Sequence, residues 1–319
     1  MTTPRVLVTG ASGFIGRPMV AALLGAGYAV RAATRRPLSL PNAVEVVTIP
    51  DLRNSIDWAP ILQGVDSVVH LAGRAHGPVA NANYSDFDLI NWMATQQLAA
   101  AAKAAGVAHF VYISSVRAQA GASAAGAVCE QDEPRPTNYY GRSKLAAETA
   151  IQASGVPFTI FRPVVIYGPN PKGNMRTLVR MARLPVPLPI ASFAGRRSLL
   201  GIDNLISAIL FALKNPATVN QTYLIADRET MTVGETLAVL RKGQGRSLMS
   251  IYIPPFVIRF LLALCGRTDL WSRVAGSLII DTSKFESLGW RPVRDTPAGL
   301  LAMVRADDSS GISMTQQIL

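Results

Sequence analysis

A tyrosine and a lysine lie four residues apart in the segment YYGRSK, which runs from Tyr139 to Lys144. On a helix that starts near Tyr139, Tyr140 and Lys144 fall on one face, one turn apart. A nearby ammonium group stabilises a phenolate and lowers the tyrosine pKa from its usual value of about 10. Such a tyrosine can exchange a proton with an alcohol or a ketone near neutral pH. The same spacing also arises by chance, so the surrounding elements must decide its meaning.

The segment GASGFIG places Gly10, Gly13 and Gly16 after the strand-like run RVLVTG and at the start of a helical stretch from about Phe14 to Ala26. Glycines there allow a sharp turn and a close approach of the backbone to a pyrophosphate, which the helix N-terminus then binds. The spacing is G-x-x-G-x-x-G, not the G-x-G-x-x-G of the simplest fingerprint. A turn without a ligand is the alternative, but its place between strand and helix predicts a dinucleotide site.

The second strand-like run, YAVRAAT, ends in RAATRRP. This segment has no Asp or Glu where an acid usually binds the ribose hydroxyls of NAD. Arg35 and Arg36 stand there instead, and an arginine favours the additional 2′-phosphate of NADP. The sequence therefore predicts that NADP(H) is favoured over NAD(H). The alternative is that both arginines are solvated loop charges.

Strand and helix signals alternate through the first half of the chain. Strand-like runs are VEVVTI, DSVVHLAG, HFVYISS and PFTIFRP, and helical runs are Tyr84 to Ala105 and SKLAAETAIQAS. This alternation predicts an α/β fold with a doubly wound parallel Rossmann sheet. Ser114 and Ser115 end one strand at the carboxyl edge, where such sheets bind ligands, so a serine hydroxyl there can hold the same substrate oxygen as Tyr140.

After about Tyr167 the sequence becomes rich in Pro and Gly, as in PNPKGN and LPVPLPI. We expect an NAD(P)-binding Rossmann domain over 1–168 and a smaller C-terminal substrate-binding lobe over 169–319. Within this lobe, about 195–226 is expected to return to the Rossmann body as a strand and a helix. The segment 121–136 has the composition of a flexible loop that orders over substrate.

The net charge of +11 favours anionic ligands, but the arginines are scattered, so nucleic acid is not expected as a partner. The apolar segment Ile251–Gly266 is short and interrupted by Pro254, Pro255 and Arg259, so no membrane span is expected. An amphipathic helix packed on the body is favoured over membrane contact. The N-terminus shows no signal-peptide pattern, which favours a cytoplasmic protein.

The cysteines and histidines indicate no metal site. Cys129 and Cys265 are far apart and fit a reducing compartment, and His70, His76 and His109 lack the spacing of metal ligands.

The motifs TGASGFIG, HLAG, ISS, YGRSK and FRPVVIYGP, in this order, resemble the extended short-chain dehydrogenase/reductase superfamily and its NAD-dependent epimerase/dehydratase family. The resemblance covers nearly the whole chain and implies a catalytic trio of Ser115, Tyr140 and Lys144. It implies cofactor contacts from both members of the Tyr140–Lys144 pair and from Gly10, Gly13, Phe14, Ile15, Gly16, Asp51, Leu52, Leu71, Ala72, Gly73, Asn91 and Val164.

In the second lobe, KGN, RRSLLGIDNL and RTDLWSR resemble segments that bind a nucleoside diphosphate, which implies Asn174, Arg197 and Arg267 as ligands of a UDP-sugar. Arginine suits a diphosphate because it binds in a bidentate manner. Beside Ser115, a dehydratase would carry an Asp-Glu pair, but Val116 and Arg117 stand there. A dehydratase is therefore disfavoured, and Arg117 is expected to face the sugar.

The resemblance implies an NAD(P)-dependent oxidoreductase acting at C4 of a nucleotide sugar. The favoured activity is reduction of a UDP-4-keto-6-deoxy-N-acetylhexosamine in surface-polysaccharide (O-antigen) synthesis. A UDP-hexose or UDP-N-acetylhexosamine 4-epimerase is the alternative, because it uses the same trio. A non-catalytic NADP-sensing regulator is a third hypothesis, which the presence of both Tyr140 and Lys144 disfavours. Whether the protein forms a homodimer is left open.

Overall fold

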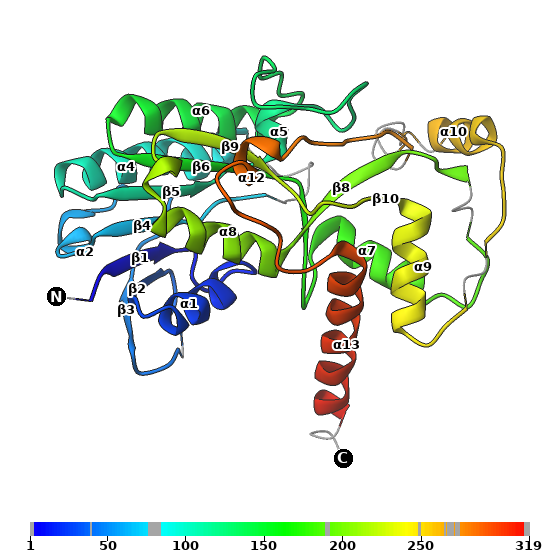
Figure 1. The fold of residues 1–319 in the computed structure, drawn as a ribbon, viewed down its shortest axis with the longest axis horizontal. Coiled ribbons are helices and arrows are strands. Elements are labelled where there is room, and N and C mark those ends of the chain that lie inside the picture. The colour runs from blue at the N-terminus through cyan, green and yellow to red at the C-terminus, as the bar shows by residue number, and fades with distance from the viewer. Residues whose placement is uncertain are drawn as a thin grey trace.

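A seven-stranded parallel sheet forms the body of the protein in the computed structural model, which describes residues 3–38, 40–75, 84–188, 192–247, 250–264, 266, 271 and 275–315. The strand order is β3-β2-β1-β4-β5-β6-β9, and every neighbouring pair is parallel (Figure 1). The strands are β1 (Arg5–Thr9), β2 (Ala29–Thr34), β3 (Val44–Thr48), β4 (Ser67–His70), β5 (His109–Ile113), β6 (Phe158–Pro163) and β9 (Gln221–Ile225). The predicted α/β fold with a Rossmann-type parallel sheet is confirmed.

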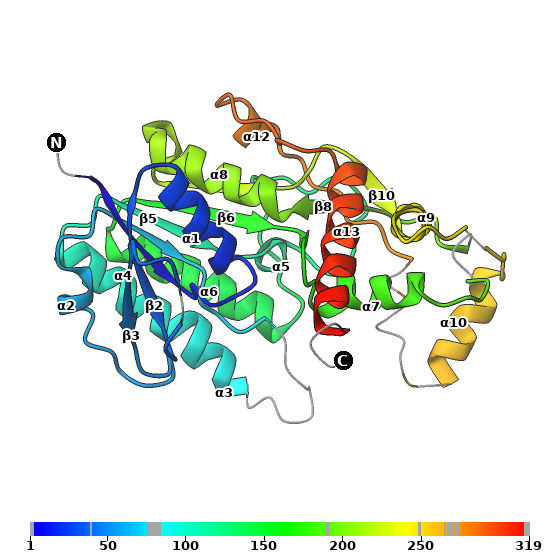
Figure 2. The ribbon, with the colours of Figure 1, turned by 90° about the horizontal axis from the view of Figure 1, so that it is seen from below.

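Helices cover both faces of this sheet, as Figure 2 shows. The helices α1 (Gly16–Gly25) and α8 (Ile202–Lys214) share one hydrophobic core with the strands. The helices α2 (Ala59–Leu62), α4 (Ala94–Ala104) and α6 (Tyr139–Ser154) share the other. Because apolar residues are buried on both faces, the central strands read as nearly continuous hydrophobic runs; all of β5 is buried.

A second, smaller sheet has the order β10-β8-β7. Its strands are β7 (Val165–Tyr167), β8 (Arg196–Gly201) and β10 (Thr230–Thr232). Around it lie α7 (Gly173–Ala182), α9 (Val233–Gly243), α10 (Pro255–Leu264) and α13 (Thr296–Thr315), while α12 (Ser283–Glu286) packs near β9. A separate core joins α7, α9 and α13. From β8 the chain passes through α8 and the 3₁₀ turn Pro216–Thr218 to β9, which lies in the main sheet beside β6.

Buried hydrogen bonds to Asp227 connect the two sheets. Tyr167 Oη donates to Asp227 Oδ2 at 2.7 Å, Asn204 Nδ2 donates to Oδ1 at 2.6 Å, and Thr296 Oγ1 donates to Oδ2 at 3.1 Å. Burial raises the pKa of Asp227, which these hydrogen bonds oppose. Since the donors come from β7, α8 and α13, a single carboxyl group holds the second sheet against the body.

The helical run expected over residues 84–105 is interrupted. It consists of α3 (Tyr84–Phe87), a π-helical segment (Asp88–Met93) and α4. The wider turn lies at Asn91, whose fully buried amide group hydrogen-bonds outside the helix. Short π-helical segments are frequent at functional sites, and the Asn91 side chain of this one lies close to Gly73, after β4.

Candidate active site

The glycine turn after β1 is shaped for close approach of a ligand. A Cβ atom at Gly16 would lie 2.1 Å from Gly10 O, and one at Gly10 would lie 2.8 Å from Ala72 N. At the start of α1, the N-cap Ile15 offers no side-chain hydrogen bond, and the first turn holds no acidic residue. The N–H groups and positive dipole end of α1 are thus available to an anion. These residues fit the pyrophosphate of a dinucleotide.

The chain after β4 lies between this turn and Lys144. Ala72 N donates to Thr9 Oγ1 at 3.3 Å. A Cβ atom at Gly73 would lie 3.1 Å from Asn91 Oδ1 and 3.3 Å from Lys144 Nζ. Asn91 Oδ1 accepts from Arg74 N at 2.7 Å, and its Nδ2 donates to Ser143 Oγ at 3.1 Å. The Leu71–Gly73 segment, Asn91 and the lysine of the motif thus form one cluster.

Ser115 and Tyr140 meet through their side chains. Ser115 is the N-cap of α5 (Val116–Gln119), and Tyr140 lies in the first turn of α6, which begins at Tyr139 as expected. Burial of its hydroxyl raises the pKa of Tyr140, whereas a hydrogen bond with Ser115 and the positive charge of Arg117 lower it. The neighbouring Ser114 donates instead to Glu148. The two consecutive serines therefore have different partners, and Ser115 is the one at the tyrosine.

Gly141 permits the close contact between α5 and α6. A Cβ atom at this position would lie 2.1 Å from the carbonyl oxygen of Arg117. At the same helix start, Asn138 Oδ1 accepts a capping hydrogen bond from Gly141 N at 2.7 Å. The glycine of the YGRSK motif is thus required by packing.

Lys144 is buried, and its ammonium group donates to Ile113 O at 2.9 Å and to Tyr112 Oη at 3.2 Å. Burial lowers the pKa of Lys144 to about 8, and the negative charge of Glu148 opposes this shift. In this structure the cation that lowers the Tyr140 pKa is Arg117. The tuning of Tyr140 by Lys144 stays a prediction.

A buried ion pair below the trio was not foreseen from the sequence. Arg162 Nη2 lies 2.5 Å from Glu148 Oε2, and the same guanidinium donates to Gln119 Oε1. Its signals were a glutamate one turn after Lys144 on an alanine-rich helix and an arginine inside the strand run PFTIFRP. Buried charges require such partners, so this pair fixes α6 against β6 and α5.

Hydrogen bonds and a β-bridge hold the 121–136 segment in this structure, and its expected flexibility and ordering over substrate stay a prediction. Gln119 Nε2 donates to Cys129 O at 3.1 Å and to Asp132 O at 2.6 Å. Val128 pairs with Ile280 in a parallel bridge, and Ala124 N donates to Ser277 O at 2.9 Å. Backbone pairing with a distant segment, which composition does not reveal, holds this loop.

Two of the expected substrate-binding arginines converge. Arg197 is half-buried in β8 and donates to Gly276 O at 2.7 Å and to Ala122 O at 2.8 Å. Its pKa is lowered by burial and by the positive charge of Arg117. Arg117 thus interacts electrostatically with both Arg197 and Tyr140, and two neighbouring cations favour an anionic ligand.

Asn174 and Arg267 are the other expected substrate ligands. Asn174 is exposed in the first turn of α7. Arg267 lies outside the described residues, as do His76 and Cys265.

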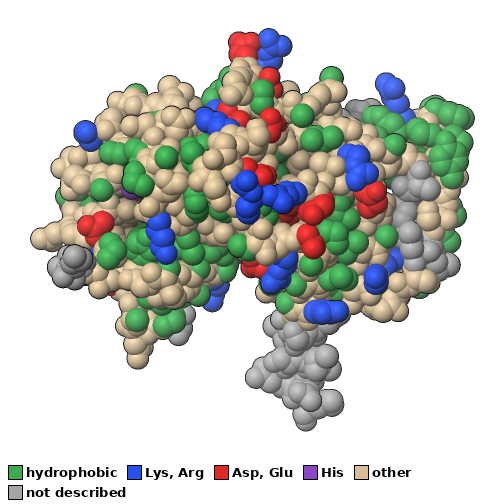
Figure 3. Space-filling view, viewed as in Figure 1, with side chains coloured by type: hydrophobic (Ala, Val, Ile, Leu, Met, Phe, Trp, Pro, Cys, Tyr) green, Lys and Arg blue, Asp and Glu red, His purple; other side chains and the backbone are tan. Residues whose placement is uncertain are grey.

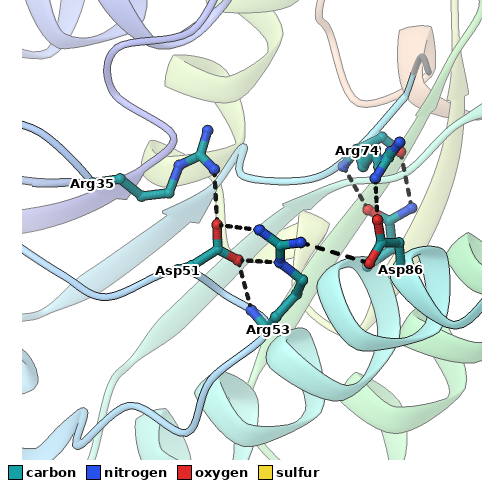
Figure 4. Close-up of polar contacts among 6 residues, drawn as sticks. Arg35, Asp51, Arg53, Arg74 and Asp86 are labelled. Carbon is teal, nitrogen blue, oxygen red and sulfur yellow. Dashed lines mark hydrogen bonds and ion pairs between the residues drawn. The ribbon is translucent and has the colours of Figure 1, made fainter. Parts of the chain in front are cut away.

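Asp51 forms an ion-pair network with the arginines around it (Figure 4). Arg53 Nε donates to Asp51 Oδ1 at 2.9 Å, and Arg35 Nη1 donates to Oδ2 at 3.1 Å. Hydrogen bonds from Arg53, followed by the weaker one from Arg35, hold the pKa of Asp51 far below its usual value. Arg53 also approaches Asp86, which binds Arg74.

This network bears on the choice of cofactor, because Arg35 already faces a carboxylate. Arg36 is exposed, and its carbonyl accepts from Thr34 Oγ1 at 2.8 Å.

The remaining expected cofactor contacts are divided between the two main cores. Val164 is buried between β6 and β7, and Leu52, next to Asp51, packs against one of the two main cores. Phe14 and Ile15 pack against the other core.

Two histidines are structural. His70 is hydrogen-bonded through Nδ1 to Thr9 Oγ1 at 2.6 Å and through Nε2 to Thr95 Oγ1 at 2.9 Å. Burial lowers its pKa to about 3 and that of His109 to about 4. Within the described ranges, no three His, Cys, Asp or Glu side chains are grouped so as to hold a metal ion.

Comparisons with known proteins agree with this geometry. Residues 6–226 match the model of the NAD dependent epimerase/dehydratase family. A UDP-glucose 4-epimerase of Vibrio cholerae is 29% identical over 313 residues, which cover 94% of each chain. The structure of MoeE5 with UDP-glucuronic acid and NAD is 26% identical, with a TM-score of 0.78 over 96% of this chain and 99% of the other.

A UDP-glucuronic acid 4-epimerase from Bacillus cereus in complex with NAD, 24% identical, shares the fold with a TM-score of 0.77 over 96% of both chains. The glycine turn, the Ser115–Tyr140 pair and the family match lead to one conclusion: this chain belongs to the NAD dependent epimerase/dehydratase family and is an enzyme of the extended short-chain dehydrogenase/reductase type.

Proposed function

We propose that the protein is an NAD-dependent 4-epimerase of a UDP-hexose or UDP-N-acetylhexosamine. The observation that carries this proposal is the hydrogen-bonded Ser115–Tyr140 pair, with the cation Arg117 acting on both Tyr140 and Arg197. This arrangement supports the roles of Tyr140 as the proton-transfer group and of the neighbouring arginines as ligands of a diphosphate. The likeness to a UDP-glucose 4-epimerase over 94% of both chains supports the same activity.

In the proposed reaction, Tyr140 Oη takes the proton of the C4 hydroxyl group of the sugar and later returns one to the same oxygen. Ser115 Oγ holds this oxygen by a hydrogen bond and so keeps it aligned with Tyr140. A bound nicotinamide ring supplies the acceptor, and then the donor, of the C4 hydride. For inversion, the 4-keto sugar presents its opposite face between the two transfers. Throughout, the positive charge of Arg117 favours the phenolate form of Tyr140, and the expected contribution of Lys144 would act in the same direction.

Arg197 and Arg117 bind the diphosphate of the substrate in this proposal. Arg197 is oriented by two carbonyl oxygens, so part of the entropic cost of ordering its side chain is met before substrate binds. A diphosphate offsets the repulsion between the two guanidinium groups. Binding energy gained there holds the sugar at Tyr140 without taking part in the chemistry.

The epimerase is supported better than the 4-ketoreductase that the sequence favoured. The full-length likeness is to an epimerase, and MoeE5, at 26% identity, was solved with NAD and a UDP-sugar. NAD is therefore the cofactor of this proposal. The preference for NADP(H) expected from Arg35 and Arg36 stays a prediction, and the ion pair of Arg35 with Asp51 weighs against it.

The test is to incubate the enzyme and NAD with UDP-glucose or with UDP-N-acetylglucosamine and to measure the 4-epimer by NMR. Tyr140→Phe should lower turnover at least about 100-fold while NAD binding is retained. Tyr139→Phe is the matched control, because its ring is exposed at the neighbouring position, and it should remain active. If the enzyme epimerises neither sugar but oxidises NADH in the presence of a 4-keto nucleotide sugar, the 4-ketoreductase becomes the supported activity.

A further inference from the structure

One face of α10 is apolar and exposed. Phe256, Phe260 and Leu264, at four-residue spacing, are 73%, 62% and 69% exposed. Ile258 and Leu262, on the other side of the helix, are partly buried. The expected packing of this helix on the body therefore accounts for only one of its faces, and three large side chains are left in solvent.

Further exposed apolar residues extend this face. Of the twelve large hydrophobic side chains found exposed among the described residues, seven lie in two neighbouring segments of the second lobe. Besides the three on α10, they are Leu184, Val186, Ile251 and Tyr252. A bridge between Leu188 and Ser250 joins the two segments. In the space-filling view, hydrophobic side chains gather over α10 at the upper right (Figure 3). Concentration of this kind marks an interaction surface.

The chain segment that contains α10 carries charge of one sign. From residue 236 to residue 268 the sequence contains no Asp or Glu. Lys242, Arg246 and Arg259 in this stretch are exposed, and Arg259 lies on α10 itself. An apolar helix face accompanied by basic residues is the pattern by which helices lie in the headgroup region of anionic membranes.

We propose that this face of α10 docks the protein on the surface of an anionic phospholipid bilayer, as a peripheral contact. No helix among the described residues is long and apolar enough to cross a membrane. A second copy of the chain fits less well, because a twofold contact would bring the two basic, acid-free 236–268 segments together. This proposal goes beyond the proposed catalytic function and does not depend on it.

The position of α10 suits such a contact. In both ribbon views it lies at the end of the molecule farthest from β1, β2 and β3 (Figures 1 and 2). The protein can therefore rest on a surface by this end while the cofactor turn after β1 stays clear of it.

The test is co-sedimentation of the full chain with vesicles of phosphatidylcholine, with or without phosphatidylglycerol. We expect binding to the anionic vesicles, weaker binding at high salt, and little binding to phosphatidylcholine alone. Phe256→Ser/Phe260→Ser should reduce the partition coefficient at least about tenfold, because two aromatic side chains that would enter the bilayer are lost. Val293→Ser, at a residue 65% exposed elsewhere, is the matched control and should bind like the wild type.

A second variant separates lipid binding from loss of folding. Arg259→Glu keeps the apolar residues, and it should weaken binding to the anionic vesicles with an unchanged melting temperature. The proposal is overturned if the wild type does not bind anionic vesicles, or if both α10 variants bind as well as the wild type. It is also overturned if the wild type is a dimer without vesicle binding and Phe256→Ser/Phe260→Ser makes it a monomer in sedimentation velocity. That result would assign the face to contact between copies.

Discussion

At the scale of single residues, Arg196 and Arg197 show that neighbours in sequence can have different roles. Arg196 is exposed and pairs with Glu235 at 3.1 Å. Arg197 is half-buried, donates to two carbonyl oxygens, and interacts electrostatically with Arg117. Only Arg197 combines the burial and the cationic neighbour that suit a diphosphate ligand.

We therefore expect Arg197→Ala to raise the KM for the nucleotide sugar about 10- to 100-fold and to change the affinity for NAD much less. The reason is that a charge-assisted hydrogen bond is worth about 1.5–3 kcal/mol, and its loss removes uniform binding of the diphosphate. Steady-state kinetics and NAD titration measure both effects. Arg196→Ala is the control and should behave like the wild type. Equal losses for sugar and NAD would show that Arg197 acts on the fold and not on the substrate.

At the scale of elements, the start of α6 is positioned by its contact with α5. In Gly141→Ala the added methyl carbon would lie 2.1 Å from the Arg117 carbonyl oxygen and would overlap it. We expect kcat/KM to fall about 100-fold, because displacing Ser115 from Tyr140 by about 1 Å has effects of this size. NAD binding should persist.

Gly25→Ala is the control, because a Cβ atom at Gly25, the last residue of α1, meets no atom within 4 Å. Wild-type turnover in Gly141→Ala would mean that α5 can shift without disturbing the contact between Ser115 and Tyr140.

The end of β2 decides a second question at this scale, the choice of cofactor. If Arg35 or Arg36 binds a 2′-phosphate, the wild type should prefer NADPH roughly tenfold, the lower limit for a charge-assisted contact at an exposed site. Replacing both arginines by alanine should then remove this preference and spare NADH. Titration of both cofactors measures it. Equal affinities in the wild type would instead assign Arg35 to its ion pair with Asp51.

At the scale of the whole molecule, buried histidines couple folding to pH. His70 connects β1 and β4 to α4, and His109 is hydrogen-bonded to Thr159 of β6 at 2.8 Å. Their folded-state pKa values are lowered by burial to about 3 and about 4. An unfolded chain binds protons on both below about pH 6.5, whereas the folded chain does not. Stability is therefore greatest above that pH and is lost as the pH falls toward the folded-state pKa values.

When the pH is lowered from 7.5 to about 5, we expect the free energy of unfolding to fall by about 2 kcal/mol for each of these two histidines. Urea unfolding at both pH values measures this loss. His109→Gln should lose about 2 kcal/mol less than the wild type over the same interval. An unchanged pH dependence in the variant would mean that other groups cause the acid sensitivity.

The sequence by itself determined the features that depend on local backbone geometry. The glycine turn, the helix that carries Tyr140 and Lys144, and the alternation of strands and helices all follow from spacing along a few residues. These patterns were sufficient to predict the parallel sheet and the family. The catalytic role of the three residues Ser115, Tyr140 and Lys144 was inferred from the family resemblance and stays a prediction.

Only the tertiary structure decided which groups face one another and which are desolvated. It brought Arg197 near Arg117, gave Arg35 an acidic partner in Asp51, and tied the 121–136 loop to residues 277–281. It also left the Phe256 face of α10 in solvent. An amphipathic pattern is the same whether its apolar face is packed or exposed, and the pKa of a side chain depends on neighbours distant in sequence. Such properties arise from packing, so the order of residues alone does not contain them in readable form.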